Sequence, residues 1–259
     1  MSMQKSWSEL QTMHRACTLV VGALDVLEEA AVPGITTEEL DRLAFAFFKK
    51  NAAKPAFLGY RGYPATLCVS INDEVVHGIP SPKRRLKDGD IVGFDLGCSI
   101  HGLFGDSART VAVGKVSDQA LRLMETTKAA LYAGIEACHP GRRVGDIGHA
   151  VQTLAEGRGY SVVREFVGHG IGTSLHEDPQ VPNYGPAGKG KRLVPGMTLA
   201  IEPMVNAGGP EVRVLDDEWT AVTVDGSLSA HFELSVAITE HGPWILSEPY
   251  PYAREAAHA

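Results

Sequence analysis

The sequence predicts an α+β fold built from two similar halves. Two segments with helical spacing of apolar residues come first, a strand-rich and glycine-punctuated segment follows, and the same order then repeats. One offset relates the halves: it carries Pro33-Gly34 onto Pro140-Gly141 and Asp95 onto Glu202. We therefore expect a single domain over 1–259, with pseudo-repeat halves at about 8–113 and 117–245 and a site at the seam between them.

Two helices are predicted at the start of the first half. Apolar residues over 8–30 recur at spacings of three and four, and Pro33-Gly34 ends this segment. Thr36, with Glu39 three residues later, forms the capping box of a second helix. The expected apolar faces are Leu10, Met13, Cys17, Val20, Leu24 and Leu27 in the first helix, and Leu40, Leu43, Ala44 and Phe47 in the second.

Strands are predicted for the rest of the first half, in LCVSI (67–71), DIVGFDLG (90–97) and RTVAV (109–113). Two further helices follow. They are marked by Leu121, Met124, Leu131 and Ile135, and by Val144, Ile147, Val151 and Leu154. The remainder is again strand-rich, in YSVVREFV (160–167), MTLAIEPMV (197–205), EWTAVTV (218–224) and ELSVAIT (233–239).

Composition narrows the class of protein. Hydrophobic residues make up 44% of the 259, which supports a sizeable core and argues against global disorder. A net charge of −7 argues against a DNA-binding surface. The four cysteines show no CxxC pair, no apolar run approaches the ~20 residues of a membrane span, and the first residues lack the apolar core of a signal peptide. We expect a cytoplasmic protein that is not in a membrane.

Acidic residues interrupt four apolar or glycine-rich stretches. Asp95 ends IVGFD, Asp106 lies in GLFGDSART, Glu202 ends MTLAIE, and Glu233 lies in AHFELSVAIT. Burying such carboxylates costs several kcal/mol each unless something neutralises them. His169, between two glycines in VGHGIG, adds an imidazole. Five hard oxygen and nitrogen ligands can hold two divalent cations, which favours metal-assisted hydrolysis.

The spacing of the two aspartates suggests a shared position. If 91–97 and 104–112 pair as a hairpin, Asp95 and Asp106 can be direct cross-strand neighbours with Cβ atoms ~5 Å apart. A solvent-facing turn with two unrelated aspartates is the alternative. His176 and His77 also lie near glycines and strand ends, although a single histidine is more often a satisfied core or surface group.

Six segments resemble methionine aminopeptidase, in its type I form. They are NDEVVHGIP (72–80), VGFDLG (92–97), FGDSART (104–110), FVGHGIGTSLHEDPQVPNYG (166–185), GMTLAIEPM (196–204) and SAHFELSVAIT (229–239). The likeness runs from about residue 5 to 247. It implies the pita-bread fold, two pseudo-symmetric α+β halves around a central antiparallel sheet, which agrees with the offset found above.

The resemblance also implies how the five ligands divide. Asp95 would chelate one metal, Asp106 and Glu233 would bridge both metals, and His169 and Glu202 would complete the second. A water between the cations would have its pKa lowered and would attack the carbonyl after the first residue, with Glu202 as proton shuttle.

The remaining roles concern the substrate. By the same likeness, His176 would hydrogen-bond the scissile carbonyl, His77 would contact the scissile amide nitrogen, and the free α-amine of the substrate would bind a metal. The methionine pocket would comprise Tyr60, Tyr63, Cys68, Leu175 and Trp219, with Phe57 beside them. Taken singly, each of these residues is better interpreted as ordinary core.

Several residues depart from the family pattern. Leu234 and Ser235 stand where histidine and threonine usually follow the last carboxylate, Leu175 replaces a residue that is often aromatic, and Arg61 and Phe57 change the mouth of the pocket. None of these is one of the five ligands, so they bear on pocket shape rather than on the reaction.

The expected function is removal of the initiator methionine from nascent proteins and peptides by a dinuclear metal centre. The ions could be cobalt, manganese, iron or zinc, since the ligand set does not choose among them. The expected partners are the N-terminal methionine of nascent chains and, transiently, the ribosome, with no DNA and no membrane, and the protein is expected to be a monomer. The alternatives are an X-Pro aminopeptidase or dipeptidase of the same fold, and a non-catalytic binding relative.

Overall fold

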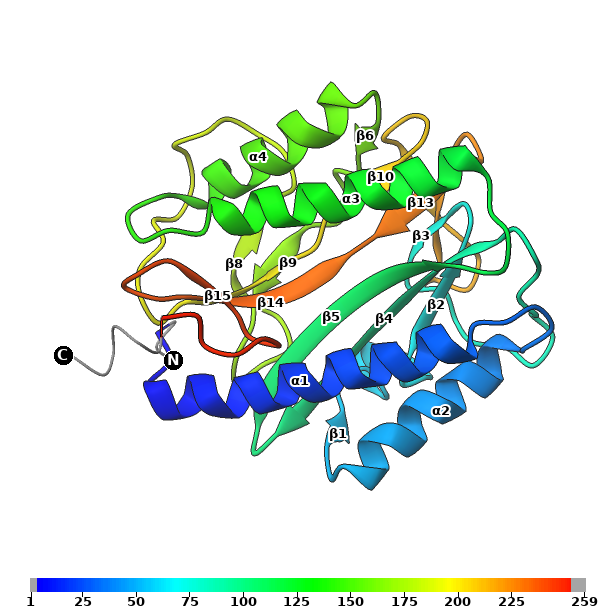
Figure 1. Ribbon diagram of the computed structural model, residues 1–259, viewed down its shortest axis with the longest axis horizontal. Coiled ribbons are helices and arrows are strands. Elements are labelled where there is room, and N and C mark those ends of the chain that lie inside the picture. Colours follow the sequence, from blue (N-terminus) through cyan, green and yellow to red (C-terminus); the bar gives the residue numbers. More distant parts are fainter. Residues whose placement is uncertain (1–3, 253–259) are drawn as a thin grey trace.

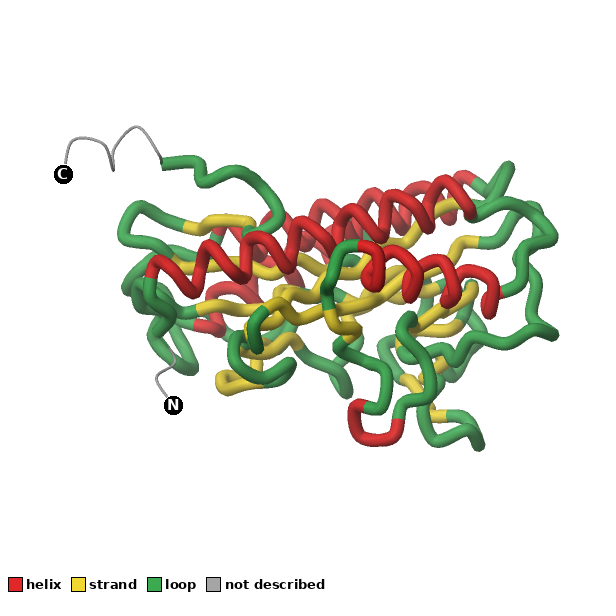
Figure 2. The backbone as a smooth tube through the Cα atoms, turned by 90° about the horizontal axis from the view of Figure 1, so that it is seen from below, coloured by secondary structure: helices red, strands yellow, loops and turns green. Residues whose placement is uncertain are grey.

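Four α-helices cover one face of a nine-stranded sheet in the computed structural model, which describes residues 4–252 (Figure 1). They are α1 (Trp7–Ala30), α2 (Thr37–Lys50), α3 (Asp118–Glu136) and α4 (Val144–Gly157). Figure 2 shows the helices on one side of the strands and much of the loop structure on the other. Residues 1–3 and 253–259, the ends of the domain expected over 1–259, lie outside the described part.

The main sheet is antiparallel, in the order β1-β4-β5-β14-β9-β7-β8, with β2 beside β4 and β15 beside β14. Since β5 and β14 are neighbours, strands from the two halves of the chain meet within this sheet. The strands are β1 (Lys54–Pro55), β2 (Cys68–Ile71), β4 (Ile91–Ile100), β5 (Leu103–Ala112), β7 (Gly168–Gly170), β8 (Glu177–Val181), β9 (Thr198–Ile201), β14 (Glu233–Ile238) and β15 (Pro243–Ile245).

Two smaller sheets complete the fold, in the orders β13-β10-β6 and β11-β12-β3. Their strands are short, so the strand segments predicted over 160–167 and 218–224 are longer than those found. The strands are β3 (Glu74–Val76), β6 (Ser161–Val162), β10 (Met204–Asn206), β11 (Val212–Val214), β12 (Ala221–Thr223) and β13 (Ser229–His231). A single 3-10 turn, Tyr60–Gly62, lies in the loop between β1 and β2.

The two halves repeat in three dimensions with the offset seen in the sequence. α2 and α4 are both 14 residues long and begin at positions 37 and 144. Before α2, the Gly34 N–H donates to the Leu86 carbonyl (2.8 Å), and before α4, the Gly141 N–H donates to the Leu193 carbonyl (2.9 Å). The predicted α+β class with two pseudo-symmetric halves is therefore confirmed.

The predicted face of α1 is confirmed, but that of α2 is partly wrong. All six apolar residues expected on the inner face of α1 are buried. On α2, Leu43 is 37% exposed, and Phe48 rather than Phe47 is fully buried. The apolar residues of α2 occur around much of its circumference, so the sequence does not single out one face. The buried residues, whose spacing fits the helical pitch, are Thr37, Leu40, Ala44 and Phe48. Similarly on α3, Leu121 is 42% exposed while Leu123 is buried.

The two faces of the sheet have different environments. Val92, Phe94 and Leu96 of β4 pack in one cluster with α1 and α2, as alternate residues of a strand do. Asp95, between two of them, therefore points to the face away from the helices. Among the described residues, no helix is long and apolar enough to span a membrane, and all four cysteines are buried and unpaired.

Candidate active site with a metal centre

The five candidate ligands come from five strands or strand ends and meet on the helix-free face of the sheet. Asp95 lies on β4, Asp106 on β5, His169 on β7 and Glu233 on β14, and Glu202 follows the last residue of β9. All five line one cavity of about 170 Å³. Asp95 and Asp106 belong to the first half of the chain, and the other three residues belong to the second.

The predicted hairpin is present, but its register differs from the one expected. Asp95 lies opposite Ala108, and Asp106 lies opposite Gly97. The two aspartates are therefore diagonal rather than direct neighbours, although they share one face of the sheet. The glycine makes room for this arrangement, because a Cβ at Gly97 would lie 3.1 Å from Asp106 Oδ1 and 3.2 Å from the Phe57 ring. The turn at 101–102 sets this register.

The seam between the halves aligns the remaining carboxylates. Glu233 lies opposite Ala108, which is also the partner of Asp95, so these two acids flank one small residue. Leu234 pairs with Ile201, and the same antiparallel register places Glu202 beside Glu233. The sheet thus gathers acidic side chains by backbone pairing alone.

Burial makes this cluster unstable as a set of free anions. Asp106 and Glu233 are each 3% exposed. Asp95 Oδ1, Asp106 Oδ1 and Glu233 Oε1 are buried without any hydrogen-bond partner. Burial raises the pKa of Asp95 to about 7, and burial together with the neighbouring carboxylates raises the pKa of Asp106, Glu202 and Glu233 well above the usual range.

His169 presents a free lone pair to the acids. Its Nδ1 lies 2.9 Å from the Gly170 carbonyl and donates to it, which leaves Nε2 as an acceptor. That Nε2 lies 3.5 Å from Glu202 Oε1, so two acceptors face each other when Glu202 is ionised. Burial lowers the pKa of His169, which argues against a proton on Nε2 as the solution. A cation between the two atoms would satisfy both.

The donor set therefore fits divalent cations. Ligand atoms of Asp106, His169 and Glu233 lie within 4.8 Å of one another, and in residues 4–252 no other group of three such side chains does so. Unpartnered buried carboxylate oxygens and one neutral imidazole are suitable ligands for ions such as Mn²⁺, Fe²⁺, Co²⁺ or Zn²⁺.

The other predicted site residues form the walls of the same cavity. Its lining includes every side chain assigned above to the substrate, together with Phe57 and Arg61: Tyr60, Tyr63, Cys68, His77, Leu175, His176 and Trp219. Tyr63 stacks edge-on against Trp219 (5.0 Å between ring centres), and its hydroxyl donates to the backbone, so only its ring is offered to the cavity.

Two neutral histidines face the cavity above the acids. Burial lowers the pKa of His77 to about 4, and burial with the neighbouring His169 lowers that of His176 to about 3. His176 Nδ1 lies 2.9 Å from the Tyr60 hydroxyl, which can donate to it and leave an N–H on Nε2. His77 has a φ of 63°, a left-handed backbone unusual outside glycine that turns its ring toward Trp219 and Phe166.

His231 was not among the predicted site residues. It is 4% exposed, and its Nε2 lies 3.9 Å from Glu202 Oε2. The available signal was its position two residues before Glu233, since alternate residues of an extended chain share a face.

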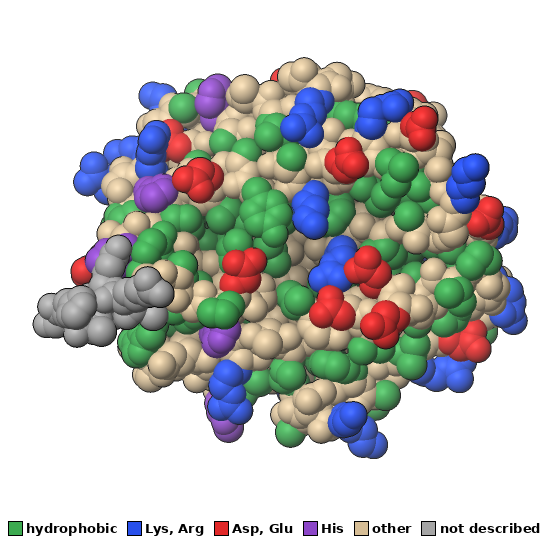
Figure 3. Space-filling view, in the orientation of Figure 1, with side chains coloured by type: hydrophobic (Ala, Val, Ile, Leu, Met, Phe, Trp, Pro, Cys, Tyr) green, Lys and Arg blue, Asp and Glu red, His purple; other side chains and the backbone are tan. Residues whose placement is uncertain are grey.

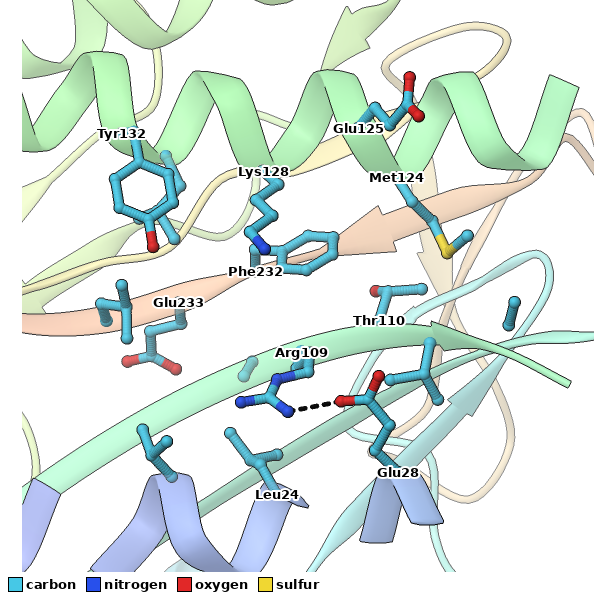
Figure 4. Close-up of a pocket in the computed structure, with 16 residues that line it drawn as sticks. Leu24, Glu28, Arg109, Thr110, Met124, Glu125, Lys128, Tyr132, Phe232 and Glu233 are labelled. Atoms are coloured by element: carbon cyan, nitrogen blue, oxygen red, sulfur yellow. Dashed lines mark hydrogen bonds and ion pairs between the residues drawn. The ribbon is translucent and has the colours of Figure 1, made fainter. Parts of the chain in front are cut away.

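A second, larger cavity lies on the helical face, between α1 and α3 (Figures 3 and 4). Its volume is about 510 Å³, and its charged groups include Lys128 and an ion pair of Arg109 with Glu28 (2.5 Å). Glu233 borders this cavity as well, from the sheet below. Because the unpartnered carboxylate oxygens belong to residues lining the smaller cavity, that cavity is the better candidate for an active site.

Comparison with known proteins identifies relatives of this chain. A model of metallopeptidase family M24 matches residues 11–240. The chain is 52% identical to methionine aminopeptidase 1 of Bacillus subtilis over 243 residues, which is 94% of this chain and 98% of that protein. A crystal structure of methionine aminopeptidase from Thermotoga maritima superposes with a TM-score of 0.93 at 47% identity, covering 95% of this chain and 98% of that one.

Prolidase from Pyrococcus furiosus shares the fold more distantly. Its TM-score is 0.75 at 23% identity, and the match covers 96% of this chain but 66% of the prolidase. These structural neighbours confirm the expected pita-bread fold. The higher identity and the nearly complete mutual coverage favour the aminopeptidases over the X-Pro enzymes.

Proposed function

The chain belongs to metallopeptidase family M24, and from that membership we propose that it removes the N-terminal methionine from nascent proteins and peptides. The observation that best supports this proposal is the smaller cavity, of about 170 Å³. Its base holds carboxylates and an imidazole with no partners, and its walls are aromatic and sulfur-bearing. Aromatic and thiol groups suit a thioether side chain.

The size of the cavity supports an exopeptidase. About 170 Å³ is small against the ~300–1,000 Å³ of pockets that enclose a drug-sized ligand. One terminal side chain fits such a space, while the rest of the peptide lies outside. A free α-amine would then come to rest next to the carboxylates, and an internal peptide segment would not enter.

We propose that Asp95, Asp106, His169, Glu202 and Glu233 would hold two divalent ions, with Asp106 and Glu233 contributing to the binding of both. When bound, such ions lower the pKa of a water and polarise a carbonyl. The two shared residues are the most buried of the carboxylates and lie on adjacent strands, β5 and β14. This supports a role for both residues in metal binding.

The chain's own groups handle the protons. Glu202, whose pKa burial raises, can take a proton from the attacking water and return it to the leaving amine. His176 can donate Nε2–H to the scissile carbonyl oxygen because Tyr60 occupies its Nδ1. His77, neutral for the same reason of burial, can bond the scissile amide nitrogen as it departs.

The proposal extends to the ions, the oligomeric state and the partners. The native ions are manganese, iron, cobalt or zinc. The protein acts as a monomer and makes transient contact with the ribosome. We place its action in the cytoplasm, since four buried unpaired thiols suit a reducing compartment. The proposal keeps a single catalytic domain over 1–259, with repeated halves at about 8–113 and 117–245.

Peptide specificity tests the reaction. Metal-free protein is supplied with Mn²⁺ or Co²⁺ and assayed on Met-Ala-Ser, on Ala-Pro-Ser and on N-acetyl-Met-Ala-Ser. We expect cleavage of the first peptide only, because the blocked amine cannot reach the carboxylates. Preferred cleavage of Ala-Pro-Ser would overturn the proposal in favour of an X-Pro enzyme.

Two variants that each replace a carboxylate by an amide test the site. Asp106→Asn should lose at least 100-fold in kcat/KM, as expected for removal of a ligand at the centre of the reaction, on the order of 3 kcal/mol. Glu136→Gln, at the exposed last residue of α3, is the control and should match the parent. If parent and Asp106→Asn were equally inactive with either metal, the protein would be a binding relative rather than an enzyme.

A further inference from the structure

One buried histidine beside the proposed metal centre has no part in the mechanism above. His231 ends β13 and is 4% exposed, and its Nε2 has no hydrogen-bond partner. Glu202 Oε2 lies 3.9 Å from this nitrogen. Leaving a buried ring nitrogen unpaired costs free energy, so the native state of the working protein should give it a partner.

The backbone of His231 is fixed by a side-chain hydroxyl. The Thr110 hydroxyl donates to the His231 carbonyl, and the His231 N–H donates to the Thr110 Oγ1, both at 2.9 Å. On its other edge, His231 pairs with Met204 of β10, two residues after Glu202. One hydroxyl therefore satisfies both backbone groups of a residue that β5 and β13 do not pair directly.

A second hydroxyl fixes Asp106 in the same manner. The Asp106 N–H donates to the Ser235 Oγ (3.2 Å), and the Ser235 hydroxyl donates to the Asp106 carbonyl (2.9 Å). Asp106 and His231, whose backbones are fixed in this way, lie on either side of the backbone pair of Ala108 with Glu233. The same kind of hydroxyl contact therefore fixes a proposed metal ligand at one end of the seam and His231 at the other.

The carboxyl group of Glu202 lies between two histidines. Its Oε1 faces His169 Nε2 at 3.5 Å, and its Oε2 faces His231 Nε2 at 3.9 Å. A movement of about 1 Å by this flexible side chain would bring the second contact into the ~2.7–3.2 Å range of a hydrogen bond. With Oε2 held by His231, Oε1 stays turned toward His169.

We propose that His231 is a positioning residue for Glu202. Its Nε2–H donates to Glu202 Oε2 and fixes the orientation of the carboxyl group, and the Thr110 hydroxyl fixes His231. This inference rests on the proposed metal site, to which Glu202 belongs. Groups that orient a metal ligand typically change metal affinity by 10–100-fold when they are removed.

Metal titration of three proteins tests the role of His231. Mn²⁺ is titrated calorimetrically into metal-free parent, His231→Gln and His231→Leu, and kcat and KM for Met-Ala-Ser are measured in parallel. We expect His231→Leu to bind the weaker of two ions at least 10-fold less tightly and to lose kcat with little change in KM. His231→Gln, whose amide can still donate, should recover most of the affinity.

The Thr110 clamp is tested with a matched control. Thr110→Val should weaken Mn²⁺ binding in the same direction, Thr110→Ser should not, and the Thr110→Val/His231→Leu double variant should be no worse than His231→Leu alone. Thr223→Val removes another buried hydroxyl, which donates to the Ser227 carbonyl in a different sheet. It should change the unfolding midpoint without changing metal affinity.

The outcomes separate this inference from the proposed function. Parent-like Mn²⁺ affinity in His231→Leu, or additive losses in the double variant, would overturn the positioning role while leaving the peptidase intact. Equal losses in His231→Gln and His231→Leu, each matched by a lower midpoint of metal-free unfolding, would mean that the ring only fills space. A parent that binds no Mn²⁺ would instead overturn the metal site.

Discussion

Several buried polar atoms of the candidate site lack a hydrogen-bond partner, and no neighbouring protein group provides one. Buried carboxylate oxygens on Asp95, Asp106 and Glu233 lack donors, and the lone pair of His169 faces another acceptor, Glu202. Each of these would cost a few kcal/mol if left alone. Since a divalent ion satisfies several acceptors at once, the same arrangement that weakens the empty site gives it affinity for metal.

This cost should appear as a pH dependence of the metal-free protein. The acids of the site have folded-state pKa values above their usual ones: burial raises the pKa of Asp95 to about 7, and burial with the neighbouring carboxylates raises the pKa values of Asp106, Glu202 and Glu233 well above the usual range. The folded state then binds more protons than the unfolded state, so stability falls as pH rises through those values. The histidines of the cavity have lowered pKa values, and their opposite effect ends near pH 6.5. We expect the urea midpoint, measured with chelator present, to fall from pH 6.5 to pH 8.5.

Asp106→Asn is the control for that experiment, because it removes one buried charge at nearly constant volume. Its midpoint should fall less steeply and should exceed that of the metal-free parent at pH 8.5. An unchanged or rising midpoint of the parent over this range would show that the acids are not the source of the pH dependence.

The sequence was enough to identify the site residues but not to show which of them are in contact. Acids that interrupt apolar strands break a local rule, and that made Glu202 and Glu233 visible. The register of Asp95 with Asp106 was wrong because the position of the turn, and not the pattern of the strands, decides which residues face each other. His231 stood out only by its place two residues before Glu233, and it was given no role because the sequence does not show that its ring nitrogen is buried and unpaired.

The elements around the site depend on a close approach of α1 to β5. A Cβ on Gly105 would lie 2.7 Å from the backbone N of Cys17 and 2.8 Å from its Sγ. The helix backbone therefore rests directly on the strand that carries Asp106, the next residue. Any side chain at Gly105 would push α1 and this strand apart.

Gly105→Ala should be costly for that reason. We expect the free energy of unfolding to fall by about 1–3 kcal/mol or more, since the contact is with backbone that cannot rotate away. Mn²⁺ affinity should fall as well, because Asp106 moves with its strand. Urea unfolding and calorimetric titration measure the two effects.

Gly157→Ala is the matched control, since a Cβ at Gly157, the last residue of α4, meets nothing within 4 Å. It should be neutral or stabilising by up to about 1 kcal/mol, and it should bind Mn²⁺ like the parent. Equal effects of the two substitutions would contradict the close packing of α1 on β5.

Long elements with a regular spacing of apolar residues were predictable from the sequence, and short strands were not. All four helices were found from apolar spacing, and the capping box at Thr36 and Glu39 marked the start of α2. The face of α2 was misplaced because its apolar residues exceed one stripe, so packing and not pattern selects Phe48 over Phe47. Strands of two or three residues, such as β6 and β12, are set by neighbouring strands and leave little signal in their own sequence.

The junction of β5 with β14 is the seam between the two halves of the molecule, and the proposed ions would lie across it. Two ligands belong to the first half and three to the second, while β5 and β14 are paired only at Ala108 with Glu233 and at Ser107 with Leu234. The hydroxyl clamps of Thr110 and Ser235 extend this limited pairing. The offset between the halves was visible in the sequence because it recurs in turns and helix starts, but the strands that meet at the seam were visible only in the structure.

Metal should therefore stabilise both halves together. At a free Mn²⁺ concentration 100 times the dissociation constant, an ion that binds only the folded state adds about 2.7 kcal/mol to the free energy of unfolding. Since the ligands span the seam, amide exchange should slow in β4 and in β9 alike, although these strands come from different halves. Hydrogen exchange with mass spectrometry, with and without Mn²⁺, measures this at both strands. Asp106→Asn, which lacks one of the proposed ligands, should lose the effect on both sides. Protection confined to β4, or an equal gain in Asp106→Asn, would place the ion away from the seam and remove the link between the halves.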